Sequence, residues 1–388
     1  MSSIKIPNLE ITNNDDDKLI INIKDADVCV VNALRRTILS KINTLVFRGF
    51  PYESNNINIT ENTTKFNNEY LKHRLSCIPI MENDETKYTT IKQNYKIMID
   101  VENTTPEKIY VTTKDIQIVN KESGKVENDQ IKNRFFPADS ITGEYILLCI
   151  LYPNYNSKNE RNEKIKLEAE FDIGCADENN CWNVVHNCTY EFRRNEQEIE
   201  KQASNIKDEL EKNDFKILNG QRIYFKNEYM FTVQSLGIYS NIDLVHKASK
   251  YILNRLHLIN NYLTTGADTK QILTSDDILS SETDGTTSNE VLNELRNQYC
   301  KLYKEENNMY VFEIKDDDYT IGKMIEYYLY SMYNKELEFV GFKKIHPTKP
   351  EAYIYIRFKN NKEELNLYYY LIHVVNELAK IFGNIEKI

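Results

Sequence analysis

Apolar and polar residues alternate with two different periods near the start of the chain. Residues 18–24, KLIINIK, alternate with the period of two that a half-buried strand shows. The following segment, about 27–42, repeats its apolar residues at helical spacing behind an aspartate that can cap a helix. The apolar side of this predicted helix consists of Val31, Leu34, Ile38 and Ile42. The opposite side is basic, with Arg35, Arg36 and Lys41.

Strand patterns dominate residues 44–190. The segments YKIMIDVENT, KIYVTTKDIQIV, YILLCILYP and KIKLEAEFDIG alternate or are rich in β-branched residues. Residues 193–213 are highly charged and predict a solvated helix or connector. A short strand is predicted at 229–235, and a helix at about 241–263 carries Ile252 and Leu256 on one face.

A polar, aperiodic stretch at 264–288 predicts a linker. A capping box, TSNE, then predicts a helix over 289–306. From residue 309 the pattern restarts with a strand, a helix at about 320–333, a pair of strands and a last helix at about 363–386.

The last predicted helix carries apolar residues at alternating spacings of three and four. This seam consists of Tyr368, Leu371, Val375, Leu378, Phe382 and Ile385. Such a repeat favours a partner helix. Packing against the helix's own sheet explains it equally well, and the two interpretations are compatible if different faces are used.

Both ends of the chain therefore follow one plan of strand, helix, more strands and a long terminal helix. This order predicts an α+β fold of two related modules that can pair within the chain. The predicted division is residues 1–46 and 191–263 for the first module, 47–190 for a β-rich insert, 264–308 for a linker containing the 289–306 helix, and 309–388 for the second module.

Composition limits the function classes. The chain has 388 residues, a net charge of -10 and no basic stripe, so we expect no direct DNA binding. We expect no signal peptide, because the N-terminal residues have no apolar core, and no membrane span, because no stretch reaches the length of one. Seven scattered cysteines favour a reducing compartment over a disulfide framework.

Candidate catalytic and metal-binding chemistry is weak. The sequence has no Gly-rich phosphate loop and no GxSxG motif. Cys175, Cys181, His186 and Cys188 lack the close Cys-x2-4-Cys spacing of zinc sites, so we expect no metal, cofactor or small-molecule substrate. A Cys/His hydrolase using Cys181 or Cys188 with His186 stays an alternative. Asp316–Asp318 is expected to begin a helix, where negative charge is favourable.

Two segments resemble the α-like subunit family of multisubunit RNA polymerases. This family includes the bacterial α-subunit N-terminal domain and the third-largest subunit of eukaryotic RNA polymerase II. The first segment has the family's Asn-x-Leu-Arg-Arg at Asn32, Leu34, Arg35 and Arg36. The second has Asn-Thr-Ser/Thr, a Glu and His-Arg-Leu-x-x-Ile-Pro at Asn62, Thr63, Thr64, Glu69, His73, Arg74, Leu75, Ile78 and Pro79.

Later segments continue this resemblance with substitutions. GCADENNCW at 174–182 keeps the Gly, Glu and Trp of a family motif but has Asn179 for His, and FTVQSLG at 231–237 has Gln234 for Glu. Residues 81–100 contain no Cys, whereas many third-subunit relatives carry a zinc loop after the Ile-Pro segment.

The last 80 residues resemble the small partner of that subunit, the eleventh subunit of polymerase II. DDDYTIGKMI at 316–325 is similar to its Glu-Asp-His-Thr-Leu-Gly-Asn-Leu motif, with Tyr319 for His. LEFVGFKKIHP at 337–347 is similar to a second motif, with Ile345 in place of Pro. Both partners on one chain, in this order, resemble the fused subunit of large cytoplasmic DNA viruses.

The resemblance implies a non-catalytic scaffold on which the largest and second-largest polymerase subunits assemble with small subunits. It implies viral transcription in the host cytoplasm and the virion. A divergent adaptor that uses the fold for another partner is the alternative. The residues implied in large-subunit docking are Arg35, Arg36, Glu69, His73 and Arg74. Those implied in pairing are Val31, Leu34, Ile38, Ile252, Leu256, Tyr368, Leu371, Val375, Leu378 and Phe382.

These docking residues also have simpler interpretations. Adjacent arginines such as Arg35 and Arg36 are often a solvated helix face, although their planar donor fork suits pairing with carboxylates. Glu69 and His73 are four residues apart and could pair with each other on a helix surface.

Overall fold

The computed structural model describes residues 4–15, 17–153, 162–269, 273–274, 299–305, 308–360 and 366–388. Their contacts form two compact units. Unit 1 comprises Met1–Ile38, Asn187–Gln234 and Asn241–Ile388, and unit 2 comprises Leu39–His186 and Ser235–Ser240. Among the described residues, none of the helices has the length and apolar character needed to span a membrane.

The first half of unit 1 is a four-stranded sheet with two helices. Its elements are β1 (Asn8–Asn14), β2 (Leu19–Lys24), α1 (Val28–Ser40), β11 (Val185–Arg194), β12 (Tyr224–Ser235) and α7 (Asn241–Thr269). The strand order is β1-β2-β12-β11. In β2, Leu19, Ile21 and Ile23 are buried, as the alternation in this segment predicts. β11 crosses the boundary that the sequence predicts at residue 190.

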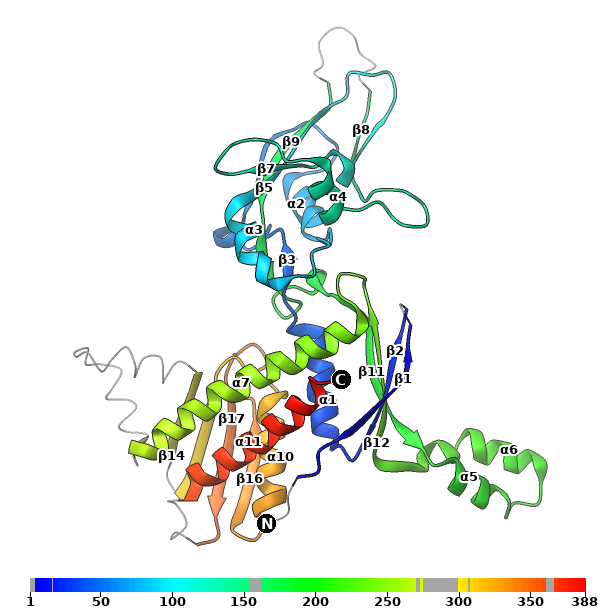
Figure 1. The fold of residues 1–388 in the computed structure, drawn as a ribbon, viewed down its shortest axis with the longest axis vertical. Helices are drawn as coiled ribbons and strands as arrows, with labels where there is room; N and C mark the ends of the chain where they lie inside the picture. Colours follow the sequence, from blue (N-terminus) through cyan, green and yellow to red (C-terminus); the bar gives the residue numbers. More distant parts are fainter. Residues whose placement is uncertain are drawn as a thin grey trace. The chain divides into compact units, whose positions relative to one another are not determined.

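The second half of unit 1 repeats this arrangement. Its elements are β13 (Leu273–Thr274), β14 (Cys300–Glu305), β15 (Met309–Ile314), α10 (Ile321–Tyr333), β16 (Leu337–Lys343), β17 (Ala352–Phe358) and α11 (Leu367–Ile385). The strand order is β13-β14-β15-β17-β16. Apart from β13 in the second half, and from the insert and the segment between β11 and β12 in the first, each half runs strand, strand, helix, strand, strand, long helix. Each sheet orders these strands first, second, fourth, third (Figure 1).

The predicted helix over 289–306 is wrong at its C-terminal end, where residues 300–305 form strand β14. Cys300 and Leu302 are buried and Lys301 between them is not, so the alternation of a strand prevails over the helical spacing. Residues 289–298 of this prediction, and its capping box, lie outside the described residues.

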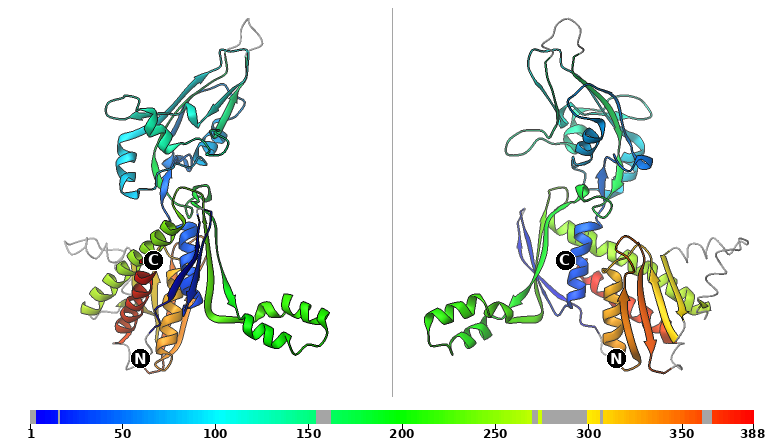
Figure 2. Two further views of the ribbon diagram at one scale, coloured as in Figure 1. Left: turned by 45° about the vertical axis from the view of Figure 1, so that its right-hand side comes forward. Right: turned by 180° about the vertical axis from the view of Figure 1, so that it is seen from behind.

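The charged segment that follows β11 forms two short helices instead of one. They are α5 (Glu196–Ala203) and α6 (Glu209–Ile217), and Asn195 and Asp208 cap their N-termini. Figures 1 and 2 show this helical pair at the end of β11 and β12, away from the other helices of unit 1. An ion pair from Lys216 to Glu200, at 2.6 Å, links the two helices.

Unit 2 is the β-rich insert. A four-stranded sheet has the order β4-β9-β5-β7, and two further pairs are β6-β8 and β10-β3. The strands are β3 (Thr44–Val46), β4 (Ile57–Asn62), β5 (Tyr95–Glu102), β6 (Ile109–Thr112), β7 (Gln117–Asn120), β8 (Leu147–Leu151), β9 (Lys164–Glu170) and β10 (Asp172–Gly174). The helices are α2 (Asn68–Ser76), α3 (Tyr88–Asn94) and α4 (Asp129–Phe135). One apolar core, with Phe47 and Phe171 in contact, joins sheet and helices.

Candidate functional site

The long helices α7 and α11 pack against each other, and so bring the two halves of unit 1 together (Figure 1). The ring of Tyr368 on α11 lies over Gly266 on α7, where an added Cβ would come 2.8 Å from Tyr368 Cε1. Another side of α11 meets its own half, since the Tyr370 ring stacks on Tyr333 with centroids 4.0 Å apart. The seam therefore packs on a partner helix while a different face of α11 packs within its own half.

Polar contacts also join α7 to the second half. Arg255 Nη2 donates to the backbone oxygen of Lys315 at 2.6 Å, just after β15. The Leu302 N–H donates to Tyr262 Oη at 2.9 Å, which ties α7 to β14. Burial raises the pKa of Tyr262, so this hydroxyl stays protonated at neutral pH.

The residues that the sequence implies in pairing all lie in the core of unit 1. On α1, α7 and α11 they are buried: Val31, Leu34, Ile38, Ile252, Leu256, Tyr368, Leu371, Val375, Leu378 and Phe382. Their role in pairing two modules stays a prediction.

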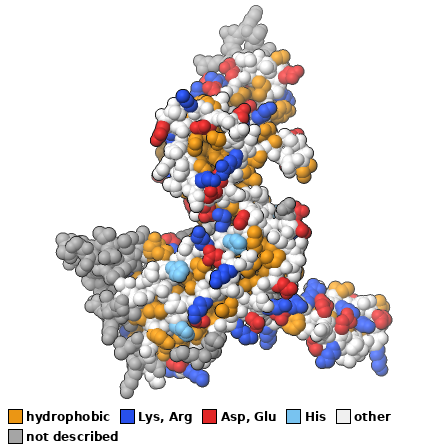
Figure 3. Space-filling model, viewed as in Figure 1, with side chains coloured by type: hydrophobic (Ala, Val, Ile, Leu, Met, Phe, Trp, Pro, Cys, Tyr) orange, Lys and Arg blue, Asp and Glu red, His pale blue; other side chains and the backbone are white. Residues whose placement is uncertain are grey.

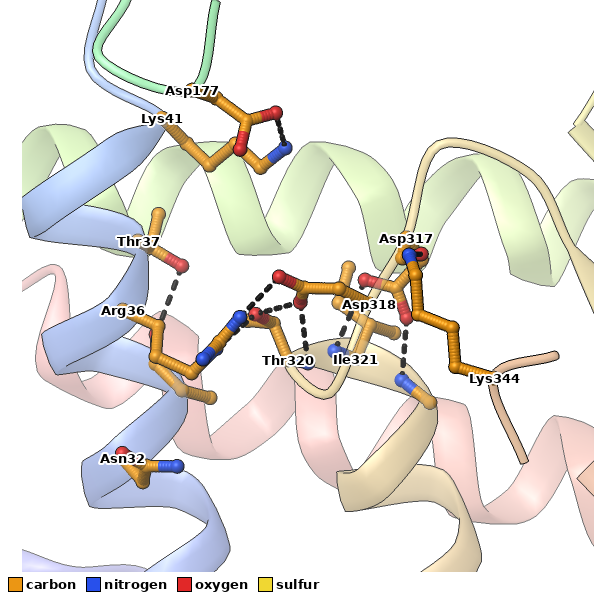
Figure 4. A network of polar contacts seen from close by, with 12 residues as sticks. Asn32, Arg36, Thr37, Lys41, Asp177, Asp317, Asp318, Thr320, Ile321 and Lys344 are labelled. Carbon is orange, nitrogen blue, oxygen red and sulfur yellow. Dashed lines mark hydrogen bonds and ion pairs between the residues drawn. The ribbon is translucent and has the colours of Figure 1, made fainter. Parts of the chain in front are cut away.

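Helices α1 and α10 contact each other in a reciprocal way. Arg36 on α1 forms an ion pair with the Asp318 carboxylate before α10 and donates from Nε to Thr320 Oγ1 at 3.1 Å (Figure 4). Conversely, Tyr327 on α10 donates to Asp27 Oδ1, before α1, at 3.0 Å. The loop that begins each helix thus holds the other helix, which is the self-complementary pattern of a two-fold interface. Figure 2 shows the two helices side by side.

Two carboxylates precede α10, as the sequence predicts, with Asp317 buried and Asp318 partly exposed. Burial alone would raise the pKa of Asp318, but the hydrogen bond from Thr320 and the charge of Arg36 outweigh it and lower that pKa. Burial raises the pKa of Asp317 to about 6, although Gly322 N–H donates to its carboxylate at 2.6 Å. The ion pair with Arg36 therefore stays charged at neutral pH, while Asp317 titrates much closer to neutrality.

Arg36 has a partner within the chain. Its guanidinium pairs with a carboxylate 282 residues away in the sequence. Arg35 donates to Asn32 Oδ1 on its own helix at 3.0 and 3.1 Å, and is partly exposed. The docking of a large subunit by the arginines of this motif stays a prediction for both residues.

In unit 2, α2 forms one wall of a surface cavity of about 570 Å³. Glu69 and His73 line it together with Trp182. Phe50 and Tyr52 line it as well, although they are 80% and 86% exposed. Exposed aromatic rings beside a cavity are typical of interaction sites. Aromatic residues on both sides of Pro51 were a signal for this cavity that motif reasoning missed.

Arg74 does not line this cavity. Its Nε donates to the Leu148 oxygen at 2.8 Å and its Nη2 to the Leu147 oxygen at 2.7 Å. Arg74 thus holds α2 on strand β8, and its role in contacting a partner stays a prediction.

The GCADENNCW segment has a structural role around Arg48. The guanidinium carbon of Arg48 lies 4.7 Å from the centre of the Trp182 ring, and Nη1 lies 2.8 Å from Glu178 Oε2. A Cβ at Gly174 would come 2.6 Å from the Trp182 ring, so only glycine fits there. The Asn179 side chain, where the resemblance leads one to expect His, accepts from the Cys181 N–H.

Cys188 gives little support to the Cys/His hydrolase alternative. Cys188 is buried, and burial raises its pKa to about 12, so little thiolate exists at neutral pH. Within the described residues, no three or more His, Cys, Asp and Glu side chains are grouped so as to hold a metal ion.

A family model, described as the RNA polymerase Rpb3/Rpb11 dimerisation domain, matches residues 20–256, more than half of the chain. The chain belongs to the Rpb3/Rpb11 dimerisation domain family. The match begins in β2 and ends within α7, and it spans the insert between them.

Two curated proteins are similar to parts of this Rpb3/Rpb11-family chain. The DNA-directed RNA polymerase II subunit rpb3 of Dictyostelium discoideum is 30% identical over 82 residues, which is 21% of this chain and 25% of that protein. A conjugation stage-specific protein of Tetrahymena thermophila is 23% identical over 196 residues, or 46% of this chain and 56% of that protein. The chain thus spans about a quarter and about half of the lengths of these relatives.

Charges are mixed on the visible surface of the Rpb3/Rpb11-family chain. In the face drawn in Figure 3, Lys and Arg side chains of the described residues are interspersed with Asp and Glu and form no continuous basic stripe. Membership of the Rpb3/Rpb11 dimerisation domain family indicates that the partners are proteins.

Proposed function

We propose that this chain is a non-catalytic assembly subunit of a DNA-directed RNA polymerase, in which two dimerisation modules are fused. The first half of unit 1 corresponds to the third-largest subunit and the second half to its small partner. The observation that carries the proposal is the repeated topology: two sheets have the same strand order, and the helices that follow their second strands, α1 and α10, contact each other reciprocally. The family match over residues 20–256 supports the assignment of the first half to this family.

In this proposal, fusion makes pairing of the modules intramolecular. A linker of about 25 residues would span roughly 25–30 Å, about one domain width, if it behaved as a flexible coil. The first residues of the predicted linker, 264–269, instead form the end of α7. The effective concentration of one module near the other is then on the order of mM. The paired modules form a platform for the largest and second-largest polymerase subunits, joined by small subunits.

Docking of the large subunits uses surfaces outside the module interface. Arg35 on α1 and the cavity beside α2, with Glu69 and His73, are the surfaces we assign to this role. The exposed rings of Phe50 and Tyr52 beside that cavity favour a protein partner.

The cellular context follows from the fused order of the modules. We propose a role in viral transcription, in the host cytoplasm and the virion, because this order resembles that of the fused subunit in large cytoplasmic DNA viruses. Detection of the chain in infected-cell cytoplasm and in purified virions tests this part of the proposal, and its detection only in nuclei contradicts it.

Purification of the tagged chain from its source, with identification of stoichiometric partners, tests the function. We expect the two large polymerase subunits at one copy each per chain. Recovery of a different stoichiometric partner without polymerase subunits would favour the adaptor alternative.

Cleavage of the linker near residue 275, through an inserted protease site, tests the pairing. The two pieces should co-purify after cleavage, because the interface and not the linker holds them. Pieces that separate and stay soluble would contradict the paired-module proposal.

A further inference from the structure

Two cysteines that are distant in the sequence lie together in unit 2. Cys77 follows the last turn of α2 and is exposed, and Cys181 lies in the short turn Asn180–Trp182. Cys181 Sγ is 3.7 Å from the backbone oxygen of Ser76, the residue that precedes Cys77. The Cys77 side chain is also near enough to contribute to the raised pKa of Cys181. The two cysteines are therefore neighbours in the fold, which is the first requirement for a disulfide.

The two thiols differ in their readiness to react. Cys77 Sγ lies 3.9 Å from His73 Nε2, which can accept the thiol proton, and it faces solvent. Burial and the neighbouring Cys77 thiol raise the pKa of Cys181 to about 11, so Cys181 holds its proton more firmly. Cys77 is therefore the thiol that attacks an oxidant first, and contact with Cys181 makes the second step intramolecular.

We propose that Cys77 and Cys181 are a modification site that forms a reversible disulfide with a small-molecule disulfide such as oxidised glutathione. The Cys77 thiolate attacks one glutathione sulfur, forms a mixed disulfide and releases one glutathione thiolate. The Cys181 thiolate then attacks Cys77 Sγ and releases the second. The protons of the two cysteines end on the two released glutathiones, and glutathione disulfide is reduced as the cysteine pair is oxidised.

The bond would join the two walls of the cavity beside α2. Glu69 and His73 come from α2 and Trp182 from the turn that contains Cys181, and all three line the cavity. The bond also closes a loop of about 100 residues, and long loops restrict the unfolded chain most. Oxidation therefore fixes the cavity in one shape. An effect on large-subunit docking rests on the proposed function, whereas formation of the bond does not.

Titration of the full-length chain with mixtures of oxidised and reduced glutathione tests the site. We expect a mass loss of two hydrogen atoms, a peptide that links Cys77 to Cys181, and full reversal by dithiothreitol. The thermal unfolding midpoint of unit 2 should rise by several degrees on oxidation. Cys77→Ser and Cys181→Ser should each abolish the linked peptide, whereas Cys175→Ser, in the same motif segment as Cys181, should leave it unchanged.

Three outcomes would overturn the site. These are a glutathione adduct on Cys77 that Cys181 does not resolve, a bridge from either cysteine to a different one, and two thiols that stay free and alkylate independently at high oxidised glutathione. The linked peptide is scored in the wild-type chain, so a variant that fails to fold does not decide the result. No polymerase subunit is needed, so failure of the scaffold proposal would leave this result unaffected.

Discussion

Arg36→Ala removes the ion pair between α1 and the loop before α10. The Arg36 and Asp318 side chains are 31% and 27% exposed, so this ion pair is neither fully exposed nor fully buried. Exposed pairs contribute about 0–1 kcal/mol to stability, and disruption of buried pairs costs about 3–5 kcal/mol. Asp318 keeps its hydrogen bonds from Thr320, so the remaining carboxylate is not stranded. We therefore expect a loss of about 2 kcal/mol, or about 30-fold in the dissociation constant of the two halves.

The assay uses the chain cleaved in its linker, because an intact linker would hide a change in affinity. Dissociation constants of the two pieces are measured for the wild type, Arg36→Ala and a matched control, Arg35→Ala. The Arg35 side chain donates hydrogen bonds to Asn32 on its own helix, so the control should change affinity by less than about threefold.

A double-mutant cycle separates the ion pair from other effects. Asp318→Asn keeps an acceptor for the Thr320 N–H but removes the charge that pairs with Arg36. The cycle should give a coupling free energy of about 1–2 kcal/mol that shrinks as salt is raised. Equal effects of Arg36→Ala and Arg35→Ala, or simple additivity in the cycle, would refute the reasoning.

Three further predictions concern the cores and the pH response. Leu371→Asp buries a charge in α11 and should abolish co-purification of the cleaved pieces. Tyr369 is half-exposed on the same helix, so Tyr369→Asp should leave co-purification intact. Gly174→Ala should lower the thermal midpoint of unit 2 in calorimetry, whereas Gly383→Ala, with open space around its Cβ, should keep or slightly raise the midpoint of unit 1. The pKa of Asp317 is about 6 in the folded chain, above its ordinary 3.8, so the folded state holds this proton more tightly. The contribution of Asp317 to the free energy of unfolding should therefore fall by roughly 1–3 kcal/mol as pH rises from 4 to 6. Urea titrations should show this fall in the wild type and not in Asp317→Asn. Parallel pH profiles of the two proteins would contradict the prediction.

Local periodicity predicts most of unit 1, because its elements are amphipathic over several turns or residues. Strand β2 and helix α10 lie within one residue of the predicted 18–24 and about 320–333. The prediction fails at residues 300–305, where six residues satisfy both periods and only the neighbouring strand β15 decides between them. Sheet pairing is a long-range choice that no local window contains.

The site was less predictable than the fold, because its contacts join distant segments. The pairing of Arg36 with Asp318 spans 282 residues, so the two residues stand in separate sequence motifs and nothing in either motif indicates that they meet. Arg74 illustrates a second difficulty, since this motif arginine bonds to carbonyl oxygens of β8, a contact that its motif does not indicate. A motif thus identifies which residues matter more readily than what each one contacts.

The packing of α7 on α11 within one chain has a consequence for how this interface can vary between related sequences. If the effective concentration is about 1 mM, an interface with an intrinsic dissociation constant of about 1 μM leaves roughly one molecule in a thousand open. A hundredfold weaker interface would still leave only about one in ten open. A substitution that would dissociate two separate chains therefore leaves most molecules of a single chain paired. Residues at the α7–α11 contact can then vary more between related sequences than the same residues in separate subunits.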